Sequence, residues 1–247
     1  LTTTQTQVDI SAGETKNVVL TAAIANLKLW DIQKPNLYSV LTEILVDGKV
    51  TDSLTEHTGF RTVQMQDGHF MVNGQKLLAR GICKHHQSEQ HWNAMTDSEL
   101  LAEWNSMLEL GCNTIRLAHY PHRRFEYSIA DENGIAIWAE NGLAGQKWDG
   151  AVKRETKPTP DGERITREMV RQNWNHPSII FWSSGNETYQ EVASHYADII
   201  RSEDTTRLIT YASAGEVPSN VDFVAGNTYQ GWYYEHYTNF KQLPRNA

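Results

Sequence analysis

Apolar and polar positions alternate with a period of two through the first quarter of the chain. The alternating pairs and runs are Val8 and Ile10, Val18 and Leu20, 37–46 and 50–60. Asp47-Gly48, which separates the two longer runs, is a dipeptide typical of tight hairpin turns. Short strands joined by regularly spaced turns are typical of an antiparallel β-sandwich. We therefore predict that residues 1–64 form the last part of a small sandwich domain.

The pattern changes near residue 65, where a small predicted hairpin around 70–72 is followed by alternating strands and helices. The predicted strands are 77–82, 114–117, 135–138, 179–182, 208–211 and 221–225. The predicted helices are 96–110, 123–133, 163–173, 190–203 and one that begins at Tyr233. The first helix has the clearest start signal, because Thr96 and Glu99 have the spacing of a capping box. Repeated strand–helix units predict a parallel sheet, either doubly wound or closed into a barrel.

Polar residues directly follow most of the predicted strands. They are His85-His86, His119-Tyr120, Glu140-Asn141, Asn186-Glu187, and Asn227 with Tyr229. The carboxyl ends of many strands supply the site of a barrel, whereas a doubly wound sheet concentrates its site at one switch point. The pattern favours a partial α/β TIM barrel over 65–247, with about six of the eight βα units of that fold.

The stretch 174–188 carries the strongest chemical signal in the chain. His176-Pro177 ends the preceding helix, because a residue before proline is excluded from the α region. The apolar run 179–182 then predicts a strand that is buried on both faces. Asn186-Glu187 follows it, so a buried strand delivers a carboxylate and an amide to the site. The alternative for Glu187 is a structural role in capping the next helix, which Thr188 could equally perform.

Composition excludes several classes of function. The chain has 247 residues and a formal charge of −8, which argues against binding nucleic acid. No apolar run approaches the roughly 20 residues that span a bilayer, so no membrane partner is expected. Eight Trp and ten Tyr, many of them late in the chain, suit core packing and also a sugar ligand with apolar faces and hydroxyl edges.

No cofactor or metal is expected from the motifs in the chain. The sequence contains neither a dinucleotide-binding glycine motif nor a phosphate loop. Cys83 and Cys112 are its only cysteines, which form neither a metal site nor a disulfide framework. His85, His86 and His91 lie close to Glu89, but their spacing matches no metal-binding motif with a mechanism behind it.

Four motifs resemble glycoside hydrolase family 2, the β-galactosidase and β-glucuronidase family. They are 59–62 with 70–76, which resemble the junction of sandwich and barrel; 115–121, the second barrel strand; 175–187, the acid/base signature; and 227–232, the sixth strand. The resemblance covers nearly the whole chain, and the motifs occur in the family's order. It implies that 1–64 belong to an immunoglobulin-like sandwich and 65–247 to a TIM barrel.

The resemblance also implies roles for individual residues. Glu187 would be the general acid/base, and Asn186 would hydrogen-bond the 2-hydroxyl of the sugar. The other expected sugar-binding residues are Arg116, His119, Glu140, Tyr229, His85, Asn227 and Trp232. Considered without the family, Arg116 could be an arginine that pairs with a carboxylate inside the barrel, and His119 could be purely structural.

The chain departs from the family pattern at three points. Cys83 stands where the family has Asn after the first barrel strand, and Ala139 stands where an Asp commonly precedes Glu140. The family's nucleophile is a Glu at the end of a seventh strand. Neither Glu216 nor Glu235 follows such a strand, so we expect the nucleophile to lie beyond the chain end and this fragment to be inactive by itself.

These expectations define a retaining exo-β-glycosidase acting on a carbohydrate substrate. A β-D-galactoside is the default, because no residue offers a paired cationic site for a uronic acid; β-glucuronidase and β-mannosidase are the alternatives. A catalytically inactive carbohydrate-binding barrel, and an enzyme whose nucleophile comes from a partner chain, are rival interpretations. The sequence is compatible with a homo-oligomer, and it leaves the cellular compartment open.

Overall fold

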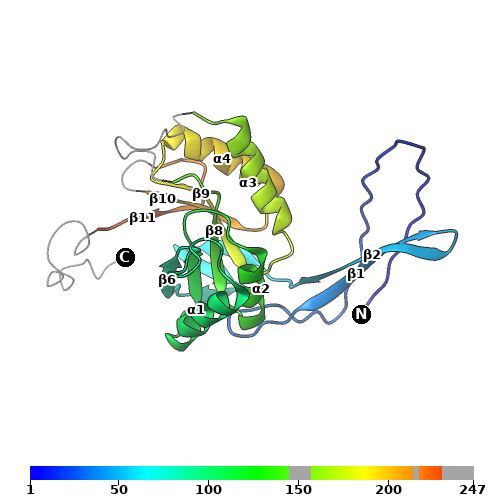
Figure 1. Cartoon of the computed structure of the whole chain (residues 1–247), viewed down its shortest axis with the longest axis horizontal. Coiled ribbons are helices and arrows are strands. Elements are labelled where there is room, and N and C mark those ends of the chain that lie inside the picture. The colour runs from blue at the N-terminus through cyan, green and yellow to red at the C-terminus, as the bar shows by residue number, and fades with distance from the viewer. Residues whose placement is uncertain (145–156, 214–216, 230–247) are drawn as a thin grey trace.

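A six-stranded parallel sheet forms the centre of the computed structural model, which describes residues 1–144, 157–213 and 217–229 (Figure 1). Its strands are β6 (Gly81–Lys84), β7 (Thr114–Leu117), β8 (Ala136–Glu140), β9 (Ile179–Asn186), β10 (Leu208–Ser213) and β11 (Phe223–Gly226). They lie side by side in chain order, and each pairs in parallel with its neighbours. Strand order that follows chain order is the arrangement of a barrel, and the described strands form part of one.

Four helices connect the first five strands of this sheet. They are α1 (Asp97–Glu109), α2 (Arg124–Asn133), α3 (Pro160–Gln172) and α4 (Gln190–Glu203). The predicted capping box is confirmed at the start of α1, where the side chain of Thr96 accepts from the backbone of Glu99 and the side chain of Glu99 accepts from the backbone of Thr96. Gly134 ends α2 in the left-handed conformation, with φ of 65°.

Apolar side chains on the outer face of the sheet pack against the helices. Ile115 and Leu117 from β7, Ile137 from β8, Trp182 from β9 and Ile209 from β10 are all fully buried. The helices contribute Trp104, Met107, Tyr127, Ala130, Met169, Val170 and Ile200 to the same cluster. This burial provides the main hydrophobic stabilisation of the domain.

A three-stranded antiparallel sheet packs its side chains against those of the large sheet. It consists of β3 (Val63–Gln66), β4 (His69–Val72) and β5 (Gln75–Leu77), which confirms the predicted hairpin around 70–72. Phe70 contacts Phe181 and Phe223 edge-on, with ring centroids 4.9 and 4.7 Å apart. These rings form a second apolar cluster with side chains near the amino ends of the parallel strands, among them Ala136, Ile180 and Leu208.

The predicted strand 77–82 is wrong in its bounds. The chain instead leaves the small sheet after Leu77 and enters the parallel sheet at Gly81. The physical reason is pairing: β5 runs antiparallel to β4, whereas β6 runs parallel to β7, so residues 78–80 must redirect the chain.

The N-terminal segment forms one hairpin, and the predicted immunoglobulin-like sandwich is not confirmed. β1 (Tyr38–Val46) pairs with β2 (Lys49–Thr58) around the predicted turn at Asp47-Gly48. Residues 1–37 contain no strand, and only an isolated bridge joins Asp31 to Lys34. A strand needs a partner, and the alternation of Val8, Ile10, Val18 and Leu20 finds none, so these side chains are exposed.

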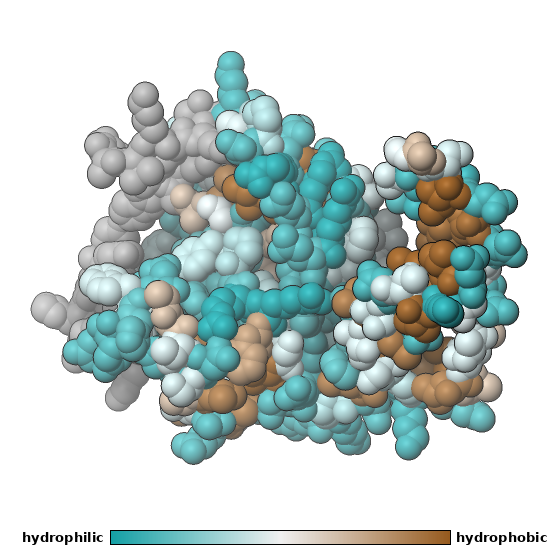
Figure 2. All heavy atoms as spheres, turned by 45° about the vertical axis from the view of Figure 1, so that its right-hand side comes forward, coloured by the Kyte–Doolittle hydropathy of each residue, from teal (hydrophilic) through white to brown (hydrophobic). Residues whose placement is uncertain are grey.

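Apolar side chains remain exposed on this hairpin. They include Val40, Leu41, Ile44, Leu45, Val46, Val50 and Leu54. Brown groups gather at the right of Figure 2, on the side where both the hairpin and the segment before it lie. The division of the chain into domains at 64/65 remains a prediction.

The segments directly before and directly after the hairpin are nevertheless tied firmly to the barrel. Trp30 is fully buried, and its indole donates to the carbonyl of Asp131 in α2 at 2.9 Å. Arg61 donates to the carbonyls of Pro177 and Ile179, at 3.1 and 2.7 Å, where β9 begins. Burial, and secondarily the nearby Arg207, lower the pKa of Arg61 to about 9.

Within the described part of the chain, none of the helices has the length and apolar character needed to cross a bilayer.

Candidate active site

Glu187 lies immediately after β9 and is held in an unusual backbone conformation. Its φ is 51°, its side chain is among the buried ones at 3% exposure, and its amide donates to the carbonyl of Ala212 in β10 at 2.9 Å. Gly185, just before it, has φ of 149°, and a Cβ there would lie 2.9 Å from Thr188 Cγ2. The pairing of β9 with β10 shifts register at this point, so the chain turns and the carboxylate is directed to the sheet end.

Two residues that follow β11 donate hydrogen bonds to the same oxygen of Glu187. Asn227 donates from Nδ2 to Oε1 at 2.7 Å, and the hydroxyl of Tyr229 also donates to Oε1. Asn227 and Tyr229 are 40 and 42 positions after Glu187 in the sequence. They reach its carboxylate because only β10 separates β9 from β11 in the sheet. Two donors on one oxygen fix the orientation of the Glu187 carboxylate.

The amide of Asn186 is oriented by two donors on its oxygen. Arg116 Nη2 and Asn227 Nδ2 each donate to Asn186 Oδ1 at 2.9 Å. With Oδ1 accepting both bonds, Nδ2 is left as the donor of this side chain, and no described residue accepts from it. An amide whose nitrogen faces a pocket can donate to a hydroxyl group of a ligand.

Arg116, His119 and Glu140 form a charged group at the ends of β7 and β8. Arg116 donates to both oxygens of Glu140, at 3.1 and 3.0 Å, and His119 Nδ1 lies 2.9 Å from Glu140 Oε1. An ionised carboxylate only accepts hydrogen bonds, so the proton of His119 is on Nδ1 and Nε2 is the nitrogen left for a ligand. The same Nδ1 lies 3.3 Å from Arg116 Nη2.

The charges of this group stabilise each other. Burial alone would raise the pKa of Glu140, but the hydrogen bond from His119 and the charge of Arg116 hold that pKa below its usual value. Burial would lower the pKa of Arg116, and the charge of Glu140 outweighs it, so the pKa of the guanidinium is raised. Burial, with His119 next, lowers the pKa of His85, which favours a neutral ring.

Glu140 lies behind the other site residues and not on the pocket wall. It is 1% exposed, and Ser183 donates to Oε2 at 3.0 Å in addition to the bonds from Arg116 and His119. Both oxygens are thus occupied by protein donors. This geometry makes Glu140 a residue that positions Arg116 and His119, while its expected contact with sugar remains a prediction.

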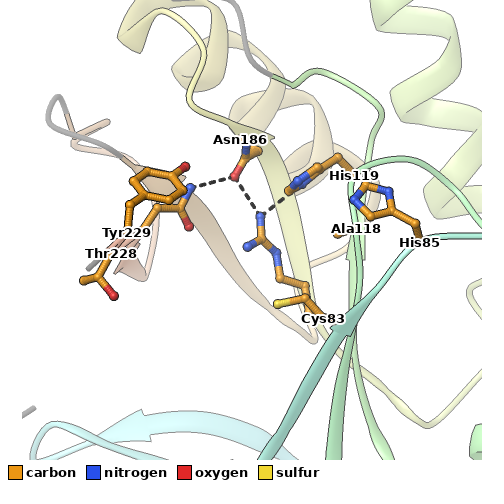
Figure 3. A pocket seen from close by; sticks show the side chains of 9 residues that line it. Cys83, His85, Ala118, His119, Asn186, Thr228 and Tyr229 are labelled. Atoms are coloured by element: carbon orange, nitrogen blue, oxygen red, sulfur yellow. Dashed lines mark hydrogen bonds between the residues drawn. The ribbon is translucent and has the colours of Figure 1, made fainter. Parts of the chain in front are cut away.

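A pocket of about 180 Å³ opens in front of this group. Its described lining consists of Cys83, His85, Arg116, Ala118, His119, Asn186, Asn227, Thr228 and Tyr229. Figure 3 shows the labelled side chains grouped around this space, with that of Thr228 extending away from the others. Amide, hydroxyl, imidazole and guanidinium groups around a small open pocket are suited to a polyhydroxylated ligand.

The structure brings most of the predicted site residues together and adds some that the sequence did not identify. Trp232 lies outside the described residues, as do Glu216 and Glu235. Ser183 and Trp138 were not predicted: the first donates to Glu140, and the second lies under the guanidinium of Arg116, with 4.8 Å between Cζ and the ring centroid. Both lie inside strands, a few residues before the polar strand ends. In the sequence, the alternation of side chains between the two faces of β8 and β9 was the available sign that they face the site.

Parallel strands in chain order, with a carboxylate, amides, an arginine and a histidine at their carboxyl ends, define the class of α/β-barrel proteins with a polar site at one end. The family model described as "Glycosyl hydrolases family 2, TIM barrel domain" matches residues 63–246, and "Glycosyl hydrolases family 2" matches 1–61. The chain belongs to glycosyl hydrolases family 2, which confirms the resemblance seen in its motifs.

Similar proteins include two curated relatives and a solved structure. A putative β-glucuronidase of Formosa agariphila is 31% identical, over 89% of this chain and 28% of the relative, and a β-glucuronidase of Bacteroides fragilis is 33% identical, over 83% and 31%. The structure of a β-D-glucuronidase of Dictyoglomus thermophilum is 27% identical, with a TM-score of 0.76, over 84% of this chain and 39% of that one. The chain therefore spans about 30% of the length of these curated relatives.

Proposed function

We propose that this chain supplies the acid/base half of a retaining exo-β-glycosidase that acts on β-D-glucuronides. The observation that carries the proposal is the placement of Glu187. It is a buried carboxylate at the end of a barrel strand, with two donors on one oxygen and the oriented amide of Asn186 beside it. In a retaining mechanism this carboxyl protonates the leaving oxygen and then accepts a proton from water.

We propose that the other half of the reaction is supplied by a group outside the described pocket lining. Retention needs a second carboxylate about 5–5.5 Å from the first, placed to attack the anomeric carbon. Glu187 lies directly behind Asn227 and Tyr229, which line the pocket and bond its carboxylate. The described lining contains no second carboxylate in a similar position, and Glu140 is buried with both oxygens accepting hydrogen bonds. We propose that the nucleophile is not among the described residues, and the sequence leads us to expect it after a further barrel strand.

The choice of glucuronide changes the preference drawn from the sequence. A β-galactoside was the default there, and the comparisons lend it no support, because the relatives that match are described as β-glucuronidases. Arg116 is the cation on the pocket wall, but Glu140 and Asn186 engage it. We therefore expect the group that pairs with a uronic carboxylate to come from residues beyond those described.

A substrate panel tests the proposed function in the whole protein. We expect hydrolysis of 4-nitrophenyl β-D-glucuronide with kcat/KM at least about 100-fold above that of the matching galactoside and mannoside, because a site that pairs a carboxylate rejects analogues without one. Product configuration, followed by NMR, should show retention. Preference for the galactoside would refute the glucuronide assignment, and binding of all three without hydrolysis would favour the inactive carbohydrate-binding barrel.

Replacement of Glu187 tests its role. Glu187→Gln should reduce kcat by about 10²–10⁴-fold, the range expected for loss of a general acid/base, and added azide should restore turnover of the nitrophenyl substrate. The matched control is Glu168→Gln on the exposed side of α3, where the carboxylate pairs with Arg164. Unchanged hydrolysis by Glu187→Gln would show that another group is the acid/base.

A further inference from the structure

A second group of charged side chains is buried behind the pocket, centred on Glu126 of α2. Glu126 is fully buried, and four donors surround its carboxylate. Lys84 Nζ and Trp104 Nε1 bond Oε2 at 2.6 and 3.0 Å, while Nδ1 of His86 and Nδ1 of His122 lie 2.7 and 3.0 Å from Oε1. Burial would raise the pKa of Glu126, but the bond from His122 and the charge of Lys84 hold it far below its usual value.

The contacts of His122 determine its charge. Its Nδ1 faces the carboxylate of Glu126, and its Nε2 lies 3.1 Å from the carbonyl oxygen of Ala118. Neither oxygen can donate, so both hydrogen bonds exist only when both ring nitrogens carry protons. His122 is fully buried, and an imidazolium there requires nearby negative charge, which Glu126 supplies.

The charges around His122 balance with this assignment. Lys84 pairs with Glu126 and also with Glu103 of α1, whose Oε2 lies 2.8 Å from Lys84 Nζ. Two carboxylates therefore face one ammonium, and the imidazolium of His122 completes the balance. The ring of His86 packs edge-on to that of His122, with centroids 5.5 Å apart.

A divalent metal ion is the alternative that the same geometry raises. One ligand atom each of His86, His122 and Glu126 lie within 4.8 Å of one another. Such an ion would replace the hydrogen bonds to Glu126 Oε1 and would add its charge beside the ammonium of Lys84. With His122 doubly protonated, its charge and that of Lys84 already balance the carboxylates of Glu126 and Glu103. A divalent ion in their place would leave excess positive charge buried, which is unfavourable.

This buried group touches both loops that supply histidines to the pocket. The Ala118 carbonyl that accepts from His122 belongs to the peptide that carries His119. His86 directly follows His85, and its backbone amide donates to the hydroxyl of Tyr120 at 3.1 Å. One carboxylate oxygen thus links the ends of β6 and β7 through two histidines, and both loops end in side chains that line the pocket.

We propose that His122 is a doubly protonated positioning residue, which holds the Ala118 carbonyl and thereby fixes His119 at the sugar subsite, with Glu126 as its counter-ion. The proposal rests on the proposed function for its kinetic consequence, because His119 acts there as a sugar ligand. The positions of His85 and His119 at the pocket then depend on the positive charge of His122, which lies behind the pocket and does not line it.

Two amide substitutions separate the two bonds of His122. In H122Q the amide nitrogen replaces Nε2 and keeps the bond to Ala118, whereas in H122N it replaces Nδ1 and keeps only the bond to Glu126. H122N should raise the KM of the glycoside about tenfold, which corresponds to one lost hydrogen bond, while its kcat falls less. H122Q should raise KM by no more than about threefold. Equal effects of the two variants would overturn the positioning role.

A spectroscopic measurement tests the charge without any substrate. In the whole protein labelled with ¹⁵N-histidine, both ring nitrogens of His122 should show protonated shifts near neutral pH, and chelator should not change them. A neutral ring, or stoichiometric zinc in elemental analysis together with chelator-sensitive shifts, would overturn the assignment. His195→Gln, which removes a partly exposed histidine paired with Glu163, is the control for both experiments.

The outcomes distinguish the two proposals. If the wild-type protein hydrolyses none of the tested glycosides, the proposed function fails and the protonation of His122 still stands on its spectrum. If hydrolysis is robust and H122N matches H122Q, the proposed function stands and the positioning role is wrong.

Discussion

Glu140 is 1% exposed, and its pKa is nevertheless held below the usual value, because His119 donates a hydrogen bond to its carboxylate and Arg116 carries a positive charge beside it. A carboxyl whose pKa is lower in the folded than in the unfolded protein stabilises the fold above its unfolded pKa. That stabilisation is lost as the pH falls toward the folded value. The site at the ends of β7 and β8 therefore gains part of its rigidity from ionisation.

We expect Glu140→Gln to change how stability depends on pH. At neutral pH the variant should be less stable by about 3 kcal/mol, because the guanidinium of Arg116 loses a buried partner. Below about pH 4, near the pKa of an unfolded Glu, the difference in melting temperature between wild type and variant should narrow. Thermal unfolding at a series of pH values measures this, and a constant difference across the range would contradict the assignment.

At the residue scale, the sequence predicted which polar groups gather but not how they are shared. Glu187, Asn186 and Asn227 were named because each follows a strand, and parallel strands place their ends together. The sequence did not show that Glu140 lies behind Arg116 and not beside the ligand, since this depends on which face of β8 its side chain occupies. The group around Glu126 was missed for a related reason: Lys84 and Glu126 are 42 residues apart and carry no common motif.

At the element scale, the ends of helices were the most predictable features. The sequence gives the start of α1 from its capping box and the end of α2 from Asn133-Gly134, because these signals act within a few residues. The bounds of β7 and α4 also agree with the prediction, because both elements have a strong local pattern of apolar and polar residues. Strands over 1–37 were predicted wrongly, because alternation alone does not supply the partner on which a strand depends.

Two glycines that end helices provide a matched comparison. Gly134 and Gly111 both have positive φ, at 65° and 75°, but a Cβ at Gly134 would lie 2.4 Å from the backbone nitrogen of Gln33, whereas nothing lies within 4 Å at Gly111. Gly111→Ala should cost about 1 kcal/mol for the backbone conformation alone. Gly134→Ala should cost about 2 kcal/mol more, because the segment before the barrel must also move.

Chemical denaturation of the two alanine variants measures this difference in the free energy of unfolding. Equal losses would mean that the contact between the end of α2 and Gln33 contributes nothing to stability.

At the scale of the whole molecule, the barrel depends on residues that precede it. Arg61 and Arg207 both donate to the carbonyl of Ile179, and Arg207 also bonds the carbonyls of Trp174 and His176. The start of β9 is thus held by Arg61, which precedes it in the sequence, and by Arg207, which follows it. Glu187 directly follows the other end of this strand. Asp204, 2.6 Å from Arg207, supplies the counter-charge.

Arg61→Met should therefore destabilise the whole protein by about 1.5–3 kcal/mol, because the carbonyl of Pro177 loses the donor that Arg61 supplies and that of Ile179 keeps only Arg207. The comparison is Arg164→Met on the exposed face of α3, where the change should stay within about 0.5 kcal/mol. Differential scanning calorimetry of both variants decides the point. Similar melting temperatures for the two would show that the junction is not structurally coupled to β9.

The burial of Trp30 and Arg61 has a consequence for recombining members of this family. A chimera joined between residues 64 and 65 would pair this barrel with a foreign tryptophan and arginine, or with neither. The indole bonded to Asp131 and the guanidinium bonded to Pro177 must instead travel with the barrel they touch. A junction placed before Trp30 keeps both contacts within one parent sequence. The segment to exchange between family members is therefore longer than residues 65–247, the barrel domain predicted from the sequence.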